Sequence, residues 1–406
     1  MIESSANVAP GAAVARRRSG NLLKTADRFL GFAVAIFILA MYLVAAVPGF
    51  SRIVHLSVGL MLLGLFLRSM AKPLRIRLDP VMLVGAVFVS YALASVLWAT
   101  DQGSALVSAV GLLIDVFAAL LVWLALQNGL NVRIIAICAA IGASVQGLVA
   151  LNQYLTGGEN RAVGLVGNAN SLAIQLSMSA FLLLLCVPRD RWAKLLPLAL
   201  IVVATVTTGT RKLIFVWFSY GVLVVRSLSP MFRRPTLGAA LVLILSPLAG
   251  WLLVSYGSVL LAPLGELTVV QRAEGTLQGR ETNTRSHLIE RALELWWDRP
   301  LTGYGIDQFR VVSEYSYYSH NNYSEILADF GIIGFLFFYS LYALLLIRAV
   351  PAALRGSNSA WTILAIVLVL LLMDVARVSY TSRMTWLTIA LMCYFSVARS
   401  EQDTPT

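Results

Sequence analysis

Charged residues are scarce in this chain. Only 13% of its 406 residues are Asp, Glu, Lys or Arg, whereas 59% are hydrophobic, and the mean hydropathy is +0.80. A soluble globular domain of this composition would expose large apolar patches, so that class is excluded. A polytopic membrane protein needs such a composition, because in lipid only helices and closed barrels satisfy the backbone. The apolar runs are continuous and do not alternate, which argues against a barrel.

Cysteine and histidine are also rare, with three of each. Cys138, Cys186 and Cys393 lie far apart in sequence, each inside an apolar run, which is typical of small buried hydrophobic residues. This pattern excludes a disulfide framework and a metal site of Cys and His ligands. The sequence also lacks a phosphate-binding loop of the Walker type. We therefore predict neither a metal nor a cofactor.

Long apolar runs are abundant. Residues 1–27 are rich in Ala, Ser and Arg without an apolar period, so we expect a disordered N-terminus. Twelve runs long enough to cross a bilayer follow, at about 29–47, 53–71, 80–98, 104–126, 133–155, 171–187, 193–209, 212–227, 236–256, 322–347, 359–376 and 384–398. The sequence predicts an all-α, polytopic helical membrane protein with about 12 transmembrane helices. Helices 1–9 occupy residues 28–256, helices 10–12 occupy 322–398, and a tail covers 399–406.

The chain is basic, with a net charge of +11. Nucleic acid and anionic lipid are the usual partners of a basic chain, but a membrane protein also collects Lys and Arg in its cytoplasmic connections. Placing both termini in the cytoplasm puts most of the basic connections inside, including those at 68–77 and 226–234. This orientation explains most of the charge without nucleic acid.

Twelve of the 31 Lys and Arg residues lie on the predicted outer face, against the orientation rule, and three of them need a specific explanation. Arg161, Arg211 and Lys212 fall in short connections on the predicted outer face, where the inside bias should exclude them. The polar break at 207–212 is compatible with an ordinary turn, but a turn does not require adjacent cations. Several cations on one outer face indicate an anionic partner, and a diphosphate matches the planar fork of arginine.

The outer segment at 257–321 resembles a folded cap more than a linker. Thr284 can begin an amphipathic helix that ends near Trp297, and Gly303 and Gly305 mark a turn after Pro300. We expect a helical cap loop on the outer face of the membrane, which the family resemblance given below makes a periplasmic one. Its tryptophans and tyrosines are suited both to anchoring at the interface and to stacking on sugars, and the sequence leaves both open.

The stretch from Ser319 to Gly334 joins this cap to an apolar run. A helix that begins near Asn322 would place Asn321, Glu325 and Asp329 on one stripe, with His320 just above it. His320 could act as a general base or merely cap the helix, and spacing alone does not decide. Asp115, in the middle of the fourth run, would cost about 3 kcal/mol in lipid unless it is paired, hydrated or protonated.

Four stretches, in this order, resemble motifs of the O-antigen ligase/polymerase superfamily. Residues 161–173 resemble its Gly-x-x-x-Asn-x-Asn stretch, and 207–214 its Thr/Ser-Arg motif on an outer turn. Residues 299–309 resemble its Pro-Leu-x-Gly-x-Gly stretch, and 319–338 its histidine signature with a following Glu and two Gly. Each motif alone is weak, whereas the four together are specific.

The resemblance implies an integral glycosyltransferase of the bacterial inner membrane whose site faces the periplasm. Its donor would be a glycan on undecaprenyl diphosphate, used with inversion and without metal or nucleotide sugar. By analogy His320 would be the base, Glu325 would orient it or the acceptor, and Arg211 would bind the diphosphate. Arg161 and either Arg280 or Arg285 would assist, with supporting roles for Lys212, Asn168, Asn170 and Asn321.

The superfamily divides by acceptor. A polymerase adds the growing chain to the next lipid-linked repeat unit of a surface polysaccharide, exopolysaccharide or O-antigen, whereas a ligase transfers the glycan to the lipid A–core of lipopolysaccharide. We favour a polymerase, because nothing in the sequence is dedicated to a core acceptor. A transporter of lipid-linked glycans is the rival class, but it should place polar groups through the bilayer midplane. A structural partner of other polysaccharide assembly proteins would explain neither the cations nor His320.

Overall fold

The computed structural model describes residues 10–43, 51–156, 161–187, 192–210, 212–228, 283–375 and 377–398. Every regular element within these ranges is a helix and none is a strand, which confirms the predicted all-α class. The earlier helices are α1 (Pro10–Leu43), α2 (Ser51–Ala71), α3 (Pro80–Ala94), η1 (Ser95–Trp98), α4 (Gln102–Gln127), α5 (Val132–Thr156), η2 (Gly164–Val166), α6 (Ala169–Cys186), α7 (Trp192–Thr208) and α8 (Leu213–Leu228). The later ones are α12 (Asn283–Asp298), α13 (Phe309–Val312), α14 (Asn322–Leu354), α15 (Asn358–Asp374) and α16 (Arg383–Ala398).

Seven described helices are long and apolar enough to cross a membrane, at Asn21–Leu43, Arg52–Ala71, Pro80–Trp98, Gln102–Gln127, Val132–Thr156, Ala169–Cys186 and Asn322–Leu354. Four shorter apolar helices cover Leu195–Thr208, Leu213–Val224, Asn358–Asp374 and Arg383–Val397. These helices coincide with eleven of the predicted runs, but the count of about 12 spans is not confirmed. The run predicted at 236–256 lies outside the described residues.

The N-terminal segment differs from the prediction. The sequence predicts disorder over residues 1–27, whereas α1 begins at Pro10, so residues 10–27 are helical. This part of the chain contains several Ala and Arg residues, which favour helix. A helix that is already nucleated by an apolar span extends into such residues at one hydrogen bond per residue, without a second nucleation step.

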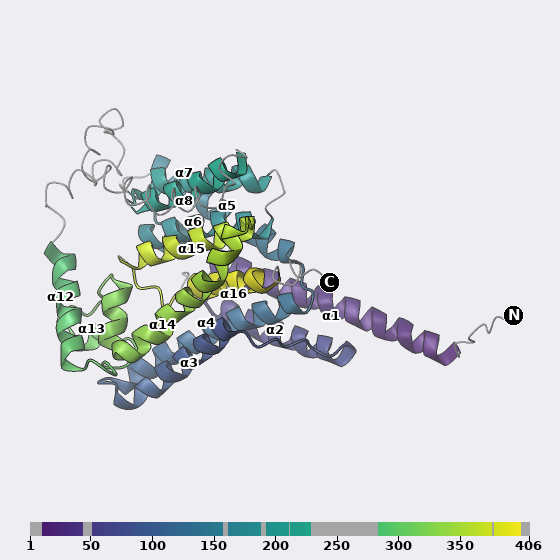
Figure 1. Ribbon diagram of the computed structural model, residues 1–406, viewed down its shortest axis with the longest axis horizontal. Coiled ribbons are helices and arrows are strands. Elements are labelled where there is room, and N and C mark those ends of the chain that lie inside the picture. Colours follow the sequence, from purple (N-terminus) through teal and green to yellow (C-terminus); the bar gives the residue numbers. More distant parts are fainter. Residues whose placement is uncertain are drawn as a thin grey trace.

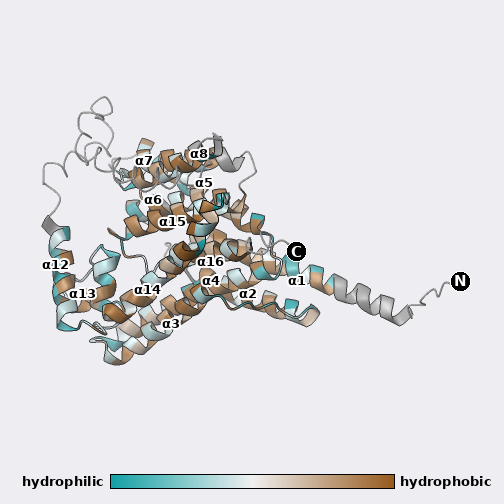
Figure 2. Ribbon diagram, viewed as in Figure 1, coloured by the Kyte–Doolittle hydropathy of each residue, from teal (hydrophilic) through white to brown (hydrophobic). Residues whose placement is uncertain are grey.

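The helix bundle is elongated, with different helices at its two ends. α12 and α13 stand at one end, and the N-terminal end of α1 projects from the other (Figure 1). α14 runs away from α12 and packs against α3 and α15, while α16 packs against α4. Hydrophobic residues dominate the helices in between, whereas α12 carries more hydrophilic ones (Figure 2). α14 therefore connects the more polar end of the bundle to its apolar interior.

An aromatic cluster holds the first half of α14 in place. Phe88 of α3 lies 5.4 Å from Phe330 and 5.4 Å from Phe338, measured between ring centroids. Tyr380 and Trp386 approach the same ring at 6.4 and 6.1 Å. Aromatic pairs at these separations add to the energy of apolar burial. The cluster therefore joins α3, α14 and α16 just below the start of α14.

Of the three states expected for Asp115, which are paired, hydrated or protonated, the structure shows the paired one. Its carboxylate accepts a hydrogen bond from the Arg383 guanidinium at the start of α16, and the residue is 7% exposed. Asp79, at the start of α3, pairs with Arg348 of α14 at 2.7 Å. Each pair joins helices that are distant in sequence, and pairing removes the cost of an isolated charge among apolar helices.

α14 is interrupted at Gly331, where φ is +62° and ψ is −165°. The backbone that precedes α13 fills the interruption: the N–H of Ile332 donates to the carbonyl of Pro300 at 2.9 Å, and the N–H of Gly305 donates to the carbonyl of Asp329 at 2.7 Å. A Cβ atom on Gly303 or Gly331 would overlap the backbone across this contact. The glycines of the two motifs at 299–309 and 319–338 therefore allow two backbones to touch.

Substituting Gly331 by alanine should destabilise the fold by about 2–4 kcal/mol, since the backbone conformation is almost restricted to glycine and the new methyl group overlaps the Leu301 carbonyl. Gly59→Ala is the matched control, because no atom lies within 4 Å of the position that its methyl group would take. The thermal unfolding temperature in detergent measures the difference. Equal unfolding temperatures for the two variants would contradict the proposed contact.

Candidate active site

The site forms where α14 begins. The side chain of Asn321 accepts hydrogen bonds from the N–H groups of Tyr323 at 2.9 Å and Ser324 at 3.1 Å, so Asn321 is the N-cap of α14. Its own amide group donates to the carbonyl of Val375 at 3.1 Å, which joins the cap to the end of α15. The predicted helix start near Asn322 agrees with the structure. Asn321, and not His320, performs the capping.

His320 directly precedes this N-cap residue, and its backbone conformation is unusual. Its φ of +59° lies in the left-handed region, which a non-glycine residue adopts only when its neighbours require it. The ring is half-buried and meets the edge of Tyr318 with 4.5 Å between centroids. Within the described part of the chain the imidazole makes no hydrogen bond. The structure gives the cap to Asn321, and the role of His320 as a base stays a prediction.

The pKa of His320 is lowered from its ordinary value. Burial is the main cause, and the positive charges of Arg285 and Lys212 add to it. A lowered pKa keeps the imidazole neutral near pH 7, which is the form that accepts a proton. The two charges come from Arg285 of α12 and from Lys212, just before α8.

Glu325 binds the backbone immediately before His320. Its carboxylate accepts a hydrogen bond from the N–H of Ser319 at 2.5 Å, and the residue is 1% exposed. The hydroxyl of Ser319 donates to the carbonyl of Asn321 at 2.9 Å. These contacts fix the residues on both sides of His320. The predicted catalytic role of Glu325 stays a prediction, and its visible role is to position the loop.

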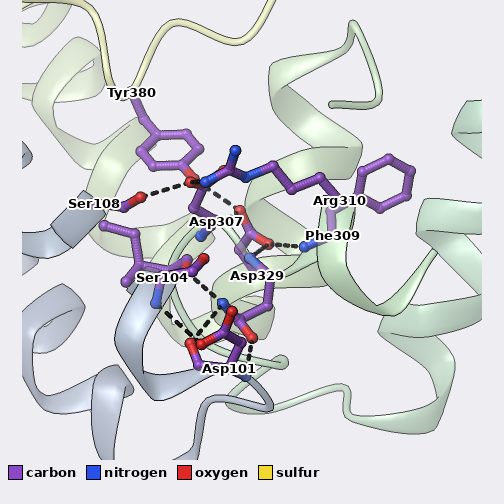
Figure 3. A network of polar contacts seen from close by, with 10 residues as sticks. Asp101, Ser104, Ser108, Asp307, Phe309, Arg310, Asp329 and Tyr380 are labelled. Atoms are coloured by element: carbon purple, nitrogen blue, oxygen red, sulfur yellow. Dashed lines mark hydrogen bonds and ion pairs between the residues drawn. The ribbon is translucent and has the colours of Figure 1, made fainter. Parts of the chain in front are cut away.

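Asp329 is the centre of a buried polar network (Figure 3). Its carboxylate accepts hydrogen bonds from the N–H groups of Gln308 at 3.0 Å and Phe309 at 2.8 Å, and from the Tyr380 hydroxyl at 2.7 Å. Asp307, which directly precedes Gln308, accepts a hydrogen bond from the Ser108 hydroxyl of α4 at 2.6 Å and pairs with Arg310 at 2.6 Å. Asp329 therefore ties the loop before α13 to α14 and to the segment before α16.

The structure joins two of the motif stretches through Arg161. Its guanidinium donates to the carbonyl of Thr208 at 2.7 Å, to Asn170 Oδ1 at 2.9 Å and to the Thr210 hydroxyl at 3.3 Å. Asn168 is the N-cap of α6, since its side chain accepts from the N–H groups of Asn170 and Ser171. The loop at 161–170 thus supports the turn at 207–210 that leads to Arg211.

The predicted cations differ in how far the structure describes them. Arg211 and Arg280 lie outside the described residues. Arg285, in the first turn of α12, is exposed, and Lys212 is half-buried. Among the predicted cations that are described, the structure brings Arg285 and Lys212 together with His320 and attaches Arg161 to the turn beside Lys212.

Asn322 is a residue that the sequence analysis did not single out. Its amide nitrogen donates to Asp374 at 3.2 Å and to the Tyr339 hydroxyl at 3.0 Å. Its amide oxygen accepts from the N–H groups of Ser379 at 2.8 Å and Tyr380 at 3.1 Å. The signal available in the sequence was a second asparagine directly after Asn321 at the start of an apolar run, because an amide that is buried there requires partners.

Within the described ranges, no group of three or more His, Cys, Asp or Glu side chains is arranged to hold a metal ion. The polar groups described above include one histidine, carboxylates that accept hydrogen bonds from neighbouring groups, and several cations. This set can bind an anion and move a proton.

These features describe an all-helical integral membrane protein with a polar site at one end of the bundle. Residues 196–339 match the model of a family described as O-antigen ligase. The match supports the resemblance to the O-antigen ligase/polymerase superfamily and includes the His320 signature and the turn at 207–212. No curated protein matches the chain.

Proposed function

We propose that the protein is an integral glycosyltransferase of the inner membrane, which moves a glycan from undecaprenyl diphosphate onto a sugar hydroxyl at the periplasmic face. Both termini would lie in the cytoplasm. The observation that carries the proposal is His320 itself, which lies beside the N-cap of α14 and whose pKa is lowered by burial and by the charges of Arg285 and Lys212. The family match supports the same class of protein.

In the proposed reaction, neutral His320 accepts the proton of the acceptor hydroxyl. The oxygen then attacks the anomeric carbon from the side opposite the diphosphate, so the configuration is inverted. The bond between the anomeric carbon and the diphosphate oxygen breaks, and the diphosphate leaves with the electron pair. The donor is already activated, so the reaction requires no cofactor.

The cations act on the leaving group. As the bond breaks, negative charge develops on the oxygen that joined the anomeric carbon to the diphosphate. Nearby arginines bind this charge more strongly in the transition state than in the ground state. We assign this role to Arg211, with Arg285 assisting from α12. Arg161 acts through the turn at 207–210, which it supports by three hydrogen bonds.

The pH dependence tests whether Arg285 acts on His320. The base must be neutral, so activity falls as the pH drops through the pKa of His320, and that pKa is lowered by burial and by Arg285 and Lys212. Arg285→Gln removes one of these charges and should raise the pKa, which moves the acid limb of the activity profile to higher pH.

Arg291→Gln is the control for this shift. Arg291 lies on the same helix and pairs with Glu294 at 2.9 Å, and its charge is not among the causes of the lowered pKa of His320. An acid limb that stays in place in Arg285→Gln, or one that moves equally in both variants, would contradict the assignment.

The polar groups support chemistry over transport. The groups around His320 lie at one end of the helices, and Asp115, an acidic residue within α4, is paired with Arg383. A transport pathway would need polar groups along the full depth of the bundle.

We favour a polymerase of surface polysaccharide, exopolysaccharide or O-antigen, with a lipid-linked repeat unit as acceptor. The second candidate is a ligase that transfers the glycan to lipid A–core, because the matched family is described as O-antigen ligase. Deleting the gene distinguishes the two. A polymerase predicts accumulation of single lipid-linked repeat units, whereas accumulation of long lipid-linked chains would contradict it and indicate a ligase. An unchanged glycan profile would contradict both.

A further inference from the structure

A second cationic site lies at the other end of the helices. The segment between α2 and α3 runs extended along the end of α4, held by two side-chain amides. The N–H of Arg75 donates to Asn128 Oδ1 at 2.9 Å, and the amide of Asn128 donates back to the carbonyl of Arg75 at 3.0 Å. The N–H of Arg77 donates to Gln127 Oε1 at 3.0 Å. The two amides thus bind alternate residues, as a neighbouring strand would.

This site is distant from His320. The start of α4 contacts the loop before α13, since the N–H of Asp101 donates to the side chain of Gln308 at 2.7 Å. Gln127 is the last residue of the same 26-residue helix. At 1.5 Å of rise per residue, α4 separates its two ends by about 39 Å. The extended segment therefore cannot take part in chemistry at His320.

The extended conformation presents two arginines on one side. Residues two apart in an extended chain point in the same direction. Arg75 and Arg77 accordingly line one cavity of about 220 Å³, together with Trp123, Gln127 and Tyr394. A second cavity of about 200 Å³ shares Arg75 and Gln127 with the first and adds Arg68 and Lys72. We refer to these two cavities, which share Arg75 and Gln127, as the cationic trough.

The positive charge in this trough is not balanced by its acidic neighbours. Asp79 is the one acidic residue among the described residues that line either cavity, and its carboxylate pairs with Arg348 at 2.7 Å. Arg68 pairs with Asp27 at 2.9 Å. The described residues offer no hydrogen bond or ion pair to the side chains of Lys72 and Arg75. These two cations remain available to a ligand.

We propose that Lys72, Arg75 and Arg77 form a binding site for a phosphate ester at the membrane surface. The guanidinium fork matches phosphate oxygens, and basic pockets between spanning helices suit anionic headgroups. A general bias for basic residues in connections does not require a backbone that two amides hold extended. The phosphate can come from an anionic phospholipid or from a soluble phosphate ester. The site does not depend on the glycosyltransferase assignment.

The test uses the full-length protein in neutral detergent micelles and measures its thermal unfolding temperature. Micelles doped with phosphatidylglycerol should raise the unfolding temperature of the wild type more than phosphatidylcholine does, and high salt should reduce the shift. R75Q/R77Q should lose most of the shift. The control K24Q/R133Q removes two charges outside both cavities and should keep it. R75K/R77K retains the charge and should keep part of it.

A parallel series with glycerol 3-phosphate distinguishes the two sources. A shift with phosphatidylglycerol alone assigns the site to lipid, and an equal arginine-dependent shift with glycerol 3-phosphate assigns it to a soluble phosphate ester. The proposal is overturned if R75Q/R77Q responds as the wild type does, or if neither phosphate compound stabilises the wild type beyond phosphatidylcholine. Because that second comparison uses only the wild type, it holds even if a variant fails to fold.

Discussion

Replacing His320 by alanine should abolish glycan extension or transfer while the protein remains inserted and abundant. The imidazole makes no hydrogen bond within the described residues, and Asn321 performs the capping of α14, so its loss leaves the fold intact. Removing a general base costs about 100- to 10,000-fold in rate. The measurement is complementation of a deletion strain, read from the polymer on the cell surface and from the amount of protein in the membrane.

His287→Ala is the matched control. His287 is exposed on α12 and pairs with Glu290 at 3.3 Å, so its removal deletes an imidazole from the cap without touching the proposed base. We expect full activity from this variant. Wild-type activity in His320→Ala would exclude the base assignment.

Replacing Arg211 by alanine should cost about 100- to 1,000-fold in rate, the usual effect of removing a group that stabilises developing negative charge. Arg211 itself lies outside the described residues, but the turn that precedes it is held by Arg161, and Lys212 after it acts on the pKa of His320. The residues on either side of Arg211 in the sequence, Thr210 and Lys212, therefore both belong to the candidate site. The measurement is the rate of transfer at several donor concentrations.

Arg211→Lys keeps the charge and changes only its shape. A lysine is a point charge and cannot bind two oxygens of a diphosphate in parallel, so it should restore activity only in part. Full recovery of activity in Arg211→Lys would contradict a bidentate contact between Arg211 and the diphosphate. Equal loss in the alanine and lysine variants would support it more strongly than the expected partial recovery.

The positions of the spanning helices follow from the sequence, because the length and hydropathy of a run are local properties. The fourth run is predicted at 104–126, and the helix covers Gln102–Gln127. The start of α14 is equally predictable, since an Asn that precedes an apolar run is a local capping signal. The prediction for residues 10–27 is wrong, because it weighs polar composition above helix propensity.

The contacts within the site could not be predicted in the same way. The sequence presents Asp329 as one member of a stripe with Glu325, yet Asp329 binds the loop before α13 whereas Glu325 binds Ser319. The partner of each carboxylate depends on which backbone lies beside it, and that is a tertiary property. The role of Gly331 is hidden for the same reason, since its conformation is explained only by the backbone at Pro300 and Leu301 that packs into the gap.

The most direct test of the proposed glycosyl transfer uses the purified protein in liposomes that contain a glycan on undecaprenyl diphosphate and a matching acceptor. The proposed mechanism predicts one free undecaprenyl diphosphate for each new glycosidic bond, without added metal, and neither product with His320→Ala. Movement of the lipid-linked glycan across the bilayer without release of undecaprenyl diphosphate would contradict the enzyme and indicate a transporter.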